Sequence, residues 1–174
     1  MRTRVWMVVG VALLGVAVFA TRYYEVDVPV WKYLTGKSAA VDPLTLHQEG
    51  EFVESNLGVG QDAGQPLTVR VIAQQYMFVP ECVEVPAETP VRFRMTSADV
   101  VHSLTIGDTG AFLKTVPGAV SETQVTFPKI GDFDMPCHEF CGAGHYAMRA
   151  KVRVVPKEQF ASLKPGERRA CAPR

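Results

Sequence analysis

One short segment of the chain concentrates side chains that bind soft metal ions. It reads Cys-His-Glu-Phe-Cys-Gly-Ala-Gly-His-Tyr-Ala-Met and runs from Cys137 to Met148. Two thiols, an imidazole and a thioether fall within this segment, and a second imidazole, His102, lies well upstream. Thiolate and thioether ligands select copper in its lower oxidation state, and imidazole binds copper in both states. The chemistry that these residues favour is therefore copper binding with one-electron transfer.

The presence of two cysteines favours a pair of coppers over a single one. Two thiolates can bridge two coppers through shared sulfurs, and each copper then takes one histidine. Gly142 and Gly144 would let the backbone fold back so that the side chains converge. The four strong donors would be His102, Cys137, Cys141 and His145, with the Met148 sulfur and a backbone carbonyl near Glu139 as weak axial donors.

Two other interpretations of the same residues stay open from the pattern alone. In an oxidising compartment, Cys137 and Cys141 could form a disulfide, which would leave both histidines and Met148 without a role. Zinc also binds two cysteines and two histidines, but it has no use for a thioether. His138 lies inside the segment, and we predict that it is not a ligand because its neighbours fill the site.

The elements expected to hold these residues are β-strands. Apolar and polar residues alternate in four short stretches, a period that places one face in a core and the other in water. Proline and glycine separate the stretches, which favours a sandwich or barrel over a parallel sheet with helices. The clearest stretches are residues 68–71, 91–95, 123–127 and 151–154.

The N-terminal segment has the features of a membrane anchor. Arg2 and Arg4 precede an apolar run from Val5 to Ala20. Extended to Tyr24, the run would form a helix of about 31 Å, enough to span a bilayer with its N-terminus in the cytoplasm. A cleaved signal peptide fits the same pattern, and either interpretation exports the rest of the chain.

These patterns divide the chain into four parts. We expect a membrane anchor at residues 1–24, a linker at 25–65, a β-domain at 66–156 and a C-terminal tail at 157–174, the tail being a surface helix or a loose end. The formal net charge of the chain is +0, which argues against nucleic-acid binding by clustered basic residues. No glycine-rich phosphate loop and no Ser-His-Asp pattern stands out.

The segment from Cys137 to Met148 resembles the copper motif of subunit II of the haem-copper cytochrome c oxidases. The match includes both cysteines, the acidic residue between them, Gly142, and the histidine and methionine that follow. Upstream, Asp99-Val-Val-His102-Ser resembles the family's histidine-bearing loop. Residues 41–50 are similar to the linker of the small, single-anchor B-family oxidases.

The resemblance implies a mainly β, cupredoxin-like Greek-key barrel or sandwich with one N-terminal transmembrane helix. It implies a dinuclear copper centre, CuA, with the six donors given above as ligands. Electrons would come from cytochrome c and pass to a haem in subunit I, where oxygen is reduced and protons are pumped. The protein would lie in the bacterial plasma membrane as a single-pass subunit, with its C-terminal domain on the periplasmic face.

Further expectations concern individual residues near this motif. Tyr76 matches an aromatic position where electrons enter, although a half-buried strand aromatic is an equal alternative. Asp99 would accept hydrogen bonds from groups around the copper ligands, or be a turn residue. The Glu139 side chain would join a magnesium site if the chain follows the larger oxidases, whereas the resemblance to the B-family implies no such site. Cys82 and Cys171 are expected to pair as a disulfide, the alternative being two unrelated thiols.

Two other functions share much of this pattern. Some nitric oxide reductases have a membrane-anchored CuA subunit of this size, and a stand-alone copper shuttle or carrier would use similar ligands. A mild acidic bias around the ligands would steer a basic cytochrome c to the site. The acidic residues are Asp99, Asp108, Glu122, Asp132, Asp134 and Glu139, against Lys114, Lys129 and Arg149.

Overall fold

The computed structural model describes residues 6, 10–16, 19, 41–160, 163–164 and 166–171. The chain divides into two compact units, residues 1–37 and 38–174. In the first unit the described residues are helical. Among them, no helix is both long and apolar enough to cross a membrane. Most of the expected anchor at residues 1–24 lies outside the described residues, so the anchor stays a prediction.

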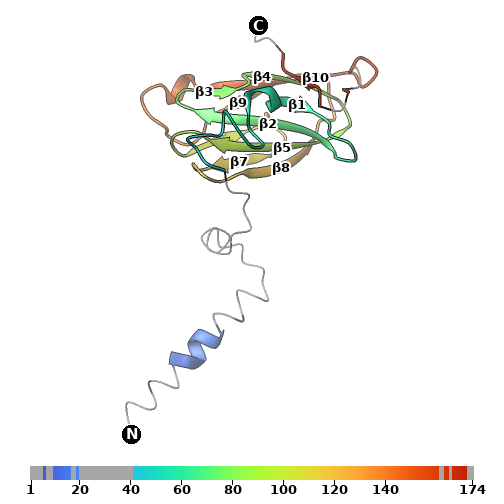
Figure 1. The fold of residues 1–174 in the computed structure, drawn as a ribbon. Coiled ribbons are helices and arrows are strands. Elements are labelled where there is room, and N and C mark those ends of the chain that lie inside the picture. Colours follow the sequence, from blue (N-terminus) through green and yellow to red (C-terminus); the bar gives the residue numbers. More distant parts are fainter. Residues whose placement is uncertain are drawn as a thin grey trace. The chain divides into compact units, whose positions relative to one another are not determined.

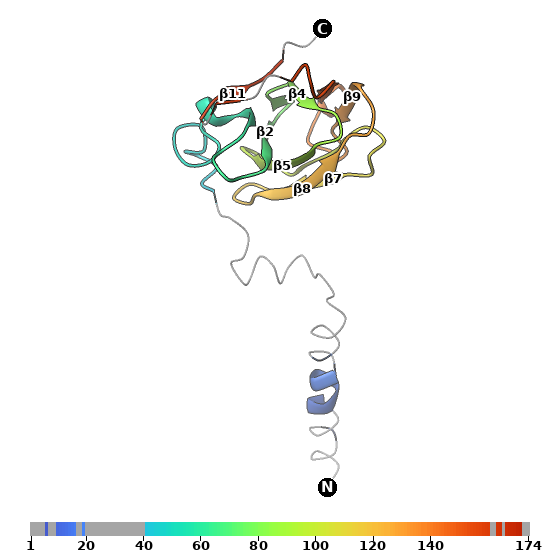
Figure 2. The same cartoon turned by 90° about the vertical axis from the view of Figure 1, so that its right-hand side faces the viewer.

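The second unit is a β-sandwich (Figures 1 and 2). The first sheet contains, in spatial order, β11 (Arg168–Arg169), β1 (Gly58–Gly60), β2 (Leu67–Gln74), β5 (Pro90–Ser97) and β8 (Ser121–Thr126), with β3 (Met77–Val79) paired to β2. The second contains β4 (Cys82–Pro86), β10 (Arg149–Val155) and β9 (Gly131–Pro136). A separate hairpin consists of β6 (His102–Thr105) and β7 (Phe112–Thr115).

The apolar and polar residues that alternate in the sequence occupy alternating buried and exposed positions in the strands. In β5 the side chains of Val91, Phe93 and Met95 are buried, whereas Arg92 and Arg94 between them are partly exposed. The same alternation occurs in β10. The four stretches expected as strands fall on β2, β5, β8 and β10, and only Phe127 lies just past the end of its strand. The mainly β expectation is confirmed.

The main core fills the space between the two sheets. Phe93 of the first sheet and Val152 of the second are both buried in one apolar cluster with Phe127. The rings of Phe93 and Phe127 meet edge to face, with their centroids 6.3 Å apart. Each fully buried side chain of this size stabilises the fold by about 1.5–3 kcal/mol. This core is the rigid base on which the loops at one end of the sandwich are held.

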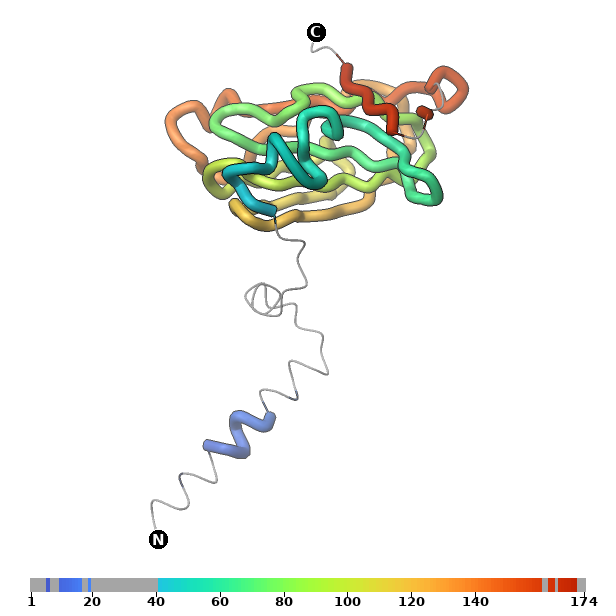
Figure 3. The backbone as a smooth tube through the Cα atoms, in the orientation of Figure 1, coloured from blue at the N-terminus to red at the C-terminus, as the bar shows by residue number. Residues whose placement is uncertain are grey.

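The later half of the expected linker is part of the folded unit, which corrects the 25–65 boundary. Leu46, Phe52 and Leu57 are buried in a second apolar cluster with Ile72 of β2. Strand β1, which follows them, pairs with β2. Figure 3 shows this blue-green segment lying against the front of the sandwich. These apolar side chains explain the difference, because burying them stabilises the folded unit.

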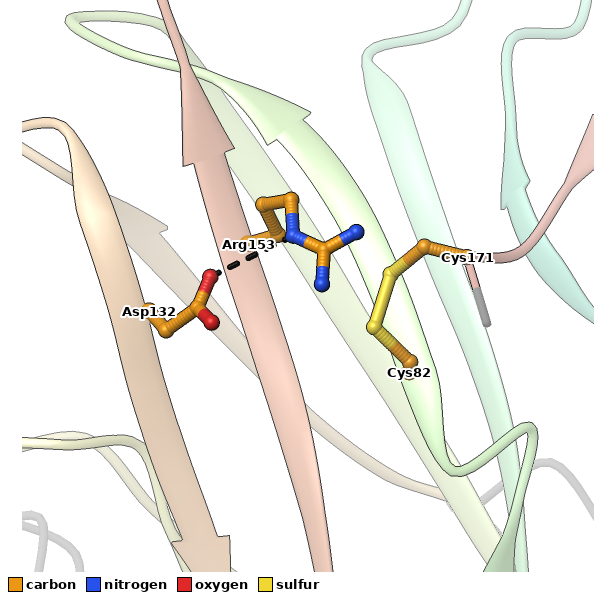
Figure 4. Close-up of a disulfide and its surroundings, with 4 residues drawn as sticks. All are labelled: Cys82, Asp132, Arg153 and Cys171. Carbon is orange, nitrogen blue, oxygen red and sulfur yellow. Dashed lines mark hydrogen bonds and ion pairs between the residues drawn. A yellow bond between two sulfur atoms is a disulfide. The ribbon is translucent and has the colours of Figure 1, made fainter. Parts of the chain in front are cut away.

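The described part of the C-terminal tail is neither a helix nor a loose end. Strand β11 pairs antiparallel with β1, with Val59 opposite Arg169. Cys171 then forms a disulfide with Cys82 at the start of β4, across a sequence separation of 89 residues. Figure 4 shows this disulfide beside the Arg153 side chain. The expectation of a Cys82–Cys171 disulfide is confirmed, and the bond explains why the tail is held.

A series of ion pairs also holds the tail to the first sheet. The Nη2 atom of Arg168 in β11 lies 2.7 Å from Oδ1 of Asp62, and Oδ2 of Asp62 lies 3.1 Å from Nη2 of Arg70 in β2. Arg70 in turn lies 3.2 Å from Glu51. The hydrogen bond from Arg168 is the largest influence on Asp62, and together with Arg70 it holds the pKa of that carboxyl below its usual value. The tail, the segment before β1 and the sheet are therefore linked by charge as well as by pairing.

Candidate metal centre

The candidate copper residues lie on loops and strand ends at one end of the sandwich. His102 begins β6. The segment from Cys137 to Met148 connects β9 to β10, and these two strands are paired, with Pro136 opposite Arg149. The amide of Cys137 donates to the carbonyl of Met148 at 3.0 Å and closes the loop at its base. The loop therefore starts and ends on a rigid strand pair, which limits how far its donors can move.

The six donors predicted from the sequence come together in this loop and its neighbour. Three donor atoms, one from each of His102, Cys137 and Cys141, all lie within 4.8 Å of one another. The Sγ atom of Cys141 lies 3.7 Å from Nδ1 of His145 and 3.7 Å from Sδ of Met148. The Glu139 carbonyl oxygen lies 3.4 Å from Sγ of Cys137. The fold thus gathers soft donors from residues far apart in the sequence.

The imidazole of His102 is oriented by a carboxylate. Its Nε2 atom lies 2.8 Å from Oδ1 of Asp99. Its Nδ1 atom is buried and has no hydrogen-bond partner among the described residues, on a side chain that is 0% exposed. A buried nitrogen without a partner is costly, and a metal ion bound there would remove that cost. The residues present therefore fit a soft metal ion held between this nitrogen and the two sulfurs.

Both cysteines of the loop are buried and free, so the alternative Cys137–Cys141 disulfide is not formed. Burial, and then the neighbouring Cys137, raise the pKa of the Cys141 thiol to about 11. The thiol therefore holds its proton at neutral pH in the reduced, metal-free protein. A metal that binds the thiolate must displace that proton, which couples loading of the site to pH.

The turn between β2 and β3 lies against the metal loop. The Gln75 side-chain amide donates to the carbonyl of Cys141, and the Gln75 backbone amide donates to Asp99 at 2.6 Å. A Cβ added at Gly144 would lie 2.5 Å from the ring of Tyr76, and one at Gly142 would lie 2.5 Å from its hydroxyl. Gly142 also has a φ of +130°, which favours glycine. The glycines thus allow Tyr76 to lie directly on the loop.

Two aromatic side chains project from the outside of the loop. Phe140 is 79% exposed and Tyr146 is 83% exposed. The ring of Phe140 also meets the ring of His145 at 5.8 Å between centroids. Tyr76 next to them is 40% exposed. We call Phe140, Tyr146 and Tyr76 the aromatic rim of the site.

The remaining polar residues of the loop have partners outside it. Nε2 of His138 lies 2.9 Å from the hydroxyl of Thr105, and His138 is exposed. The Glu139 carboxylate lies 2.8 Å from Nζ of Lys114 on β7. Sequence analysis did not identify the contacts of Gln75 and Lys114, because both depend on how separate turns and strands meet. No local signal in the sequence could have revealed them.

The two-sheet sandwich, with a buried histidine and two free cysteines at one end, defines a cupredoxin-like copper-binding domain. Comparison with known proteins narrows the class. Residues 66–155 match the family described as cytochrome c oxidase subunit II, periplasmic domain. The chain belongs to the cytochrome c oxidase subunit II family.

Individual relatives agree with this assignment. A cytochrome c oxidase subunit 2 of Thermus thermophilus is 31% identical over 149 residues, which cover 86% of this chain and 89% of the relative. A second subunit 2 from the same species is 34% identical over 119 residues, covering 68% and 88% of the two chains.

Solved structures show the same fold. A chain of a haem-copper terminal oxidase dimer has a TM-score of 0.51 and 24% identity, with 88% of this chain and 96% of that chain covered. The periplasmic domain of oxidase subunit II of Bradyrhizobium japonicum has a TM-score of 0.50 and 24% identity, with 55% and 89% covered.

Family membership sets the general role of the protein. It is an electron-transfer subunit of a terminal oxidase and works within a membrane-associated haem-copper oxidase complex. The oxidase prediction is thereby confirmed, and neither the nitric oxide reductase nor the stand-alone copper protein is favoured by any of these relatives.

Proposed function

We propose that the site holds a dinuclear copper centre of the CuA type. The bridging ligands would be the thiolates of Cys137 and Cys141, with one imidazole, His102 or His145, for each copper. Copper bound here would supply one-electron transfer between two oxidation states. The axial donors would be the Met148 sulfur and the Glu139 carbonyl oxygen, which lie 3.7 Å and 3.4 Å from the nearest cysteine sulfur.

The observation that carries this proposal is the buried His102 Nδ1 atom without a partner, beside two free cysteines. Asp99 would keep the proton on the opposite nitrogen, Nε2, so that Nδ1 is available as a donor. Carboxylates that orient a ligating histidine in this way also raise its basicity. Burial opposes ionisation of Asp99, but hydrogen bonds from the Gln75 amide and His102 keep the pKa of Asp99 below its usual value.

Cytochrome c would deliver electrons across the aromatic rim. Tyr76 would be where electrons enter, since its ring lies against Gly144 of the metal loop and is 40% exposed. The expected acidic steering is weakened by local pairing. Glu122, Asp132 and Glu139 each form an ion pair with a nearby arginine or lysine. Docking through the rim should therefore be mainly apolar and should respond weakly to ionic strength.

The onward path would lead to a haem in subunit I, where oxygen is reduced and protons are pumped. In this proposal the subunit is held in the bacterial plasma membrane by a single N-terminal helix, with the copper domain on the periplasmic face. The apolar run from Val5 to Ala20 after two arginines supports the anchor. A rigid site suits such transfer because its geometry need change little when an electron arrives.

Magnesium at Glu139 is a separate prediction with less support. Among the described residues, the one group of histidine, cysteine or carboxylate side chains that could hold a metal is His102, Cys137 and Cys141. The Glu139 carboxylate instead faces Lys114. Metal analysis of the purified complex would detect magnesium, and its absence would remove this prediction.

Electron delivery to the haem tests the proposed function. In the purified complex, cytochrome c should reduce the subunit I haem rapidly in the unaltered protein. Cys141→Ala should abolish this reduction but leave direct reduction of the haem by dithionite intact. His138→Ala is the matched control in the same loop, and it should keep both its copper and the rate. Normal haem reduction by cytochrome c in Cys141→Ala would contradict the proposal.

A further inference from the structure

The residue between the two cysteines has two separate contacts. The backbone oxygen of Glu139 lies 3.4 Å from Sγ of Cys137, inside the site. Its side-chain carboxylate lies 2.8 Å from Nζ of Lys114. One residue therefore joins the donor set to a charged group on another strand.

Lys114 lies on the hairpin that carries the first histidine. In the pairing of β6 with β7, Ser103 lies opposite Lys114 and His102 lies opposite Thr115. The carbonyl of Ser103 accepts a hydrogen bond from the amide of His138 at 2.9 Å. The hairpin and the cysteine loop are thus joined at two adjacent loop residues, by the backbone hydrogen bond at His138 and by the Lys114 ion pair at Glu139.

This ion pair is too exposed to contribute much to stability. The side chains of Lys114 and Glu139 are 50% and 37% exposed, and solvent-exposed pairs of this kind contribute little to stability. The pair can nevertheless change the balance between the oxidised and reduced forms of a metal centre beside it. An unpaired carboxylate beside a metal centre favours the more positive, oxidised form of that centre, and a lysine paired with it cancels that preference.

We propose that Lys114 is a positioning residue that sets the reduction potential of the copper centre through Glu139. Its ammonium neutralises the carboxylate, and the pair restrains the loop residue whose carbonyl is the weak axial donor. Axial donors and the polarity around the sulfurs are the means by which a protein tunes such a centre. This inference rests on the proposed copper centre.

The test is a redox titration of the copper-loaded, full-length chain. Lys114→Met should lower the potential, with a change in the equilibrium constant for reduction of up to about fivefold, the size expected of the Coulomb effect of one charge near the protein surface. Lys114→Arg, which keeps the charge, should restore the value of the unaltered protein. Lys129→Met is the matched control, because Lys129 lies beyond the far end of β9, roughly 20 Å of strand from the cysteine loop. It should leave the potential unchanged.

The same titration in the Glu139→Gln variant shows whether Lys114 acts through Glu139. In Glu139→Gln the carboxylate is already gone, so adding Lys114→Met should shift the potential much less than it does in the unaltered chain. An unchanged potential in Lys114→Met, or an equal shift in both backgrounds, would overturn the inference while the copper centre itself stood. If the unaltered chain held no copper pair, both the proposed function and this inference would fail.

Discussion

Nε2 of His102 lies 2.8 Å from the Asp99 carboxylate, while Nδ1 of the same ring is buried without a partner. The contact occupies Nε2 and leaves Nδ1 as the ring nitrogen available to a metal ion. Asp99→Ala should therefore weaken copper binding roughly 10- to 100-fold, the usual cost of losing such a partner. Competition with a copper chelator would measure it. Asp108→Ala, an exposed aspartate in the β6–β7 turn, is the control. Equal affinities in the two variants would show that Asp99 does not orient His102.

The close approach of Tyr76 to Gly144 predicts that substitutions at these two residues have non-additive effects on stability. A Cβ at Gly144 would lie 2.5 Å from the tyrosine ring, so Gly144→Ala should destabilise the fold by about 1–3 kcal/mol through overpacking. In a Tyr76→Ala background the ring is absent, and the same substitution should cost much less. Urea unfolding of the reduced, metal-free protein would give both values. The same cost in both backgrounds would contradict the contact.

The Cys82–Cys171 disulfide should stabilise the fold without affecting the metal site. It closes a long loop, with a sequence separation of 89 residues, so removing it should cost about 3–5 kcal/mol. The double variant Cys82→Ala, Cys171→Ala avoids leaving one unpaired, reactive thiol. Urea unfolding should show the loss, while the copper spectrum should stay the same. An unchanged unfolding midpoint would mean that strand pairing alone holds the tail.

The Arg168–Asp62 pair predicts a pH-dependent part of the stability. The pKa of Asp62 is lowered in the folded protein, chiefly by the hydrogen bond from Arg168. A lowered folded pKa contributes stability above the unfolded pKa and loses it as pH falls through the folded value. Asp62→Asn should thus be less stable than the unaltered protein at pH 7, and the gap should narrow below about pH 4. A gap of the same size at pH 7 and pH 3 would contradict this.

The strands and the clustering of the candidate donors could be predicted from the sequence for physical reasons, while the role of the six donors stays a prediction. Alternating burial depends on period two along a single strand, as in β5, and can be read locally. The donors between Cys137 and Met148 lie in one loop, so their spacing alone brings them together. Only His102 required contact between distant segments, and there the resemblance to a known family supplied what spacing could not.

The parts that sequence analysis missed depend on non-local contacts. Leu46 and Phe52 have no regular period, so nothing local indicated that their segment packs on β2. Strand β11 has two residues, too few to show alternation. The Lys114–Glu139 pair depends on the register of β7 beside the cysteine loop. Each of these contacts is decided by tertiary packing and not by local pattern.

The decisive measurement for the dinuclear centre is the electron paramagnetic resonance spectrum of the copper-loaded, full-length chain, with copper counted per chain. We expect two coppers and a seven-line hyperfine pattern, because two coppers held by His102, Cys137, Cys141 and His145 would share one unpaired electron. One copper with a four-line pattern would mean a mononuclear site and would contradict the account. So would a reduced chain that takes up no copper at all.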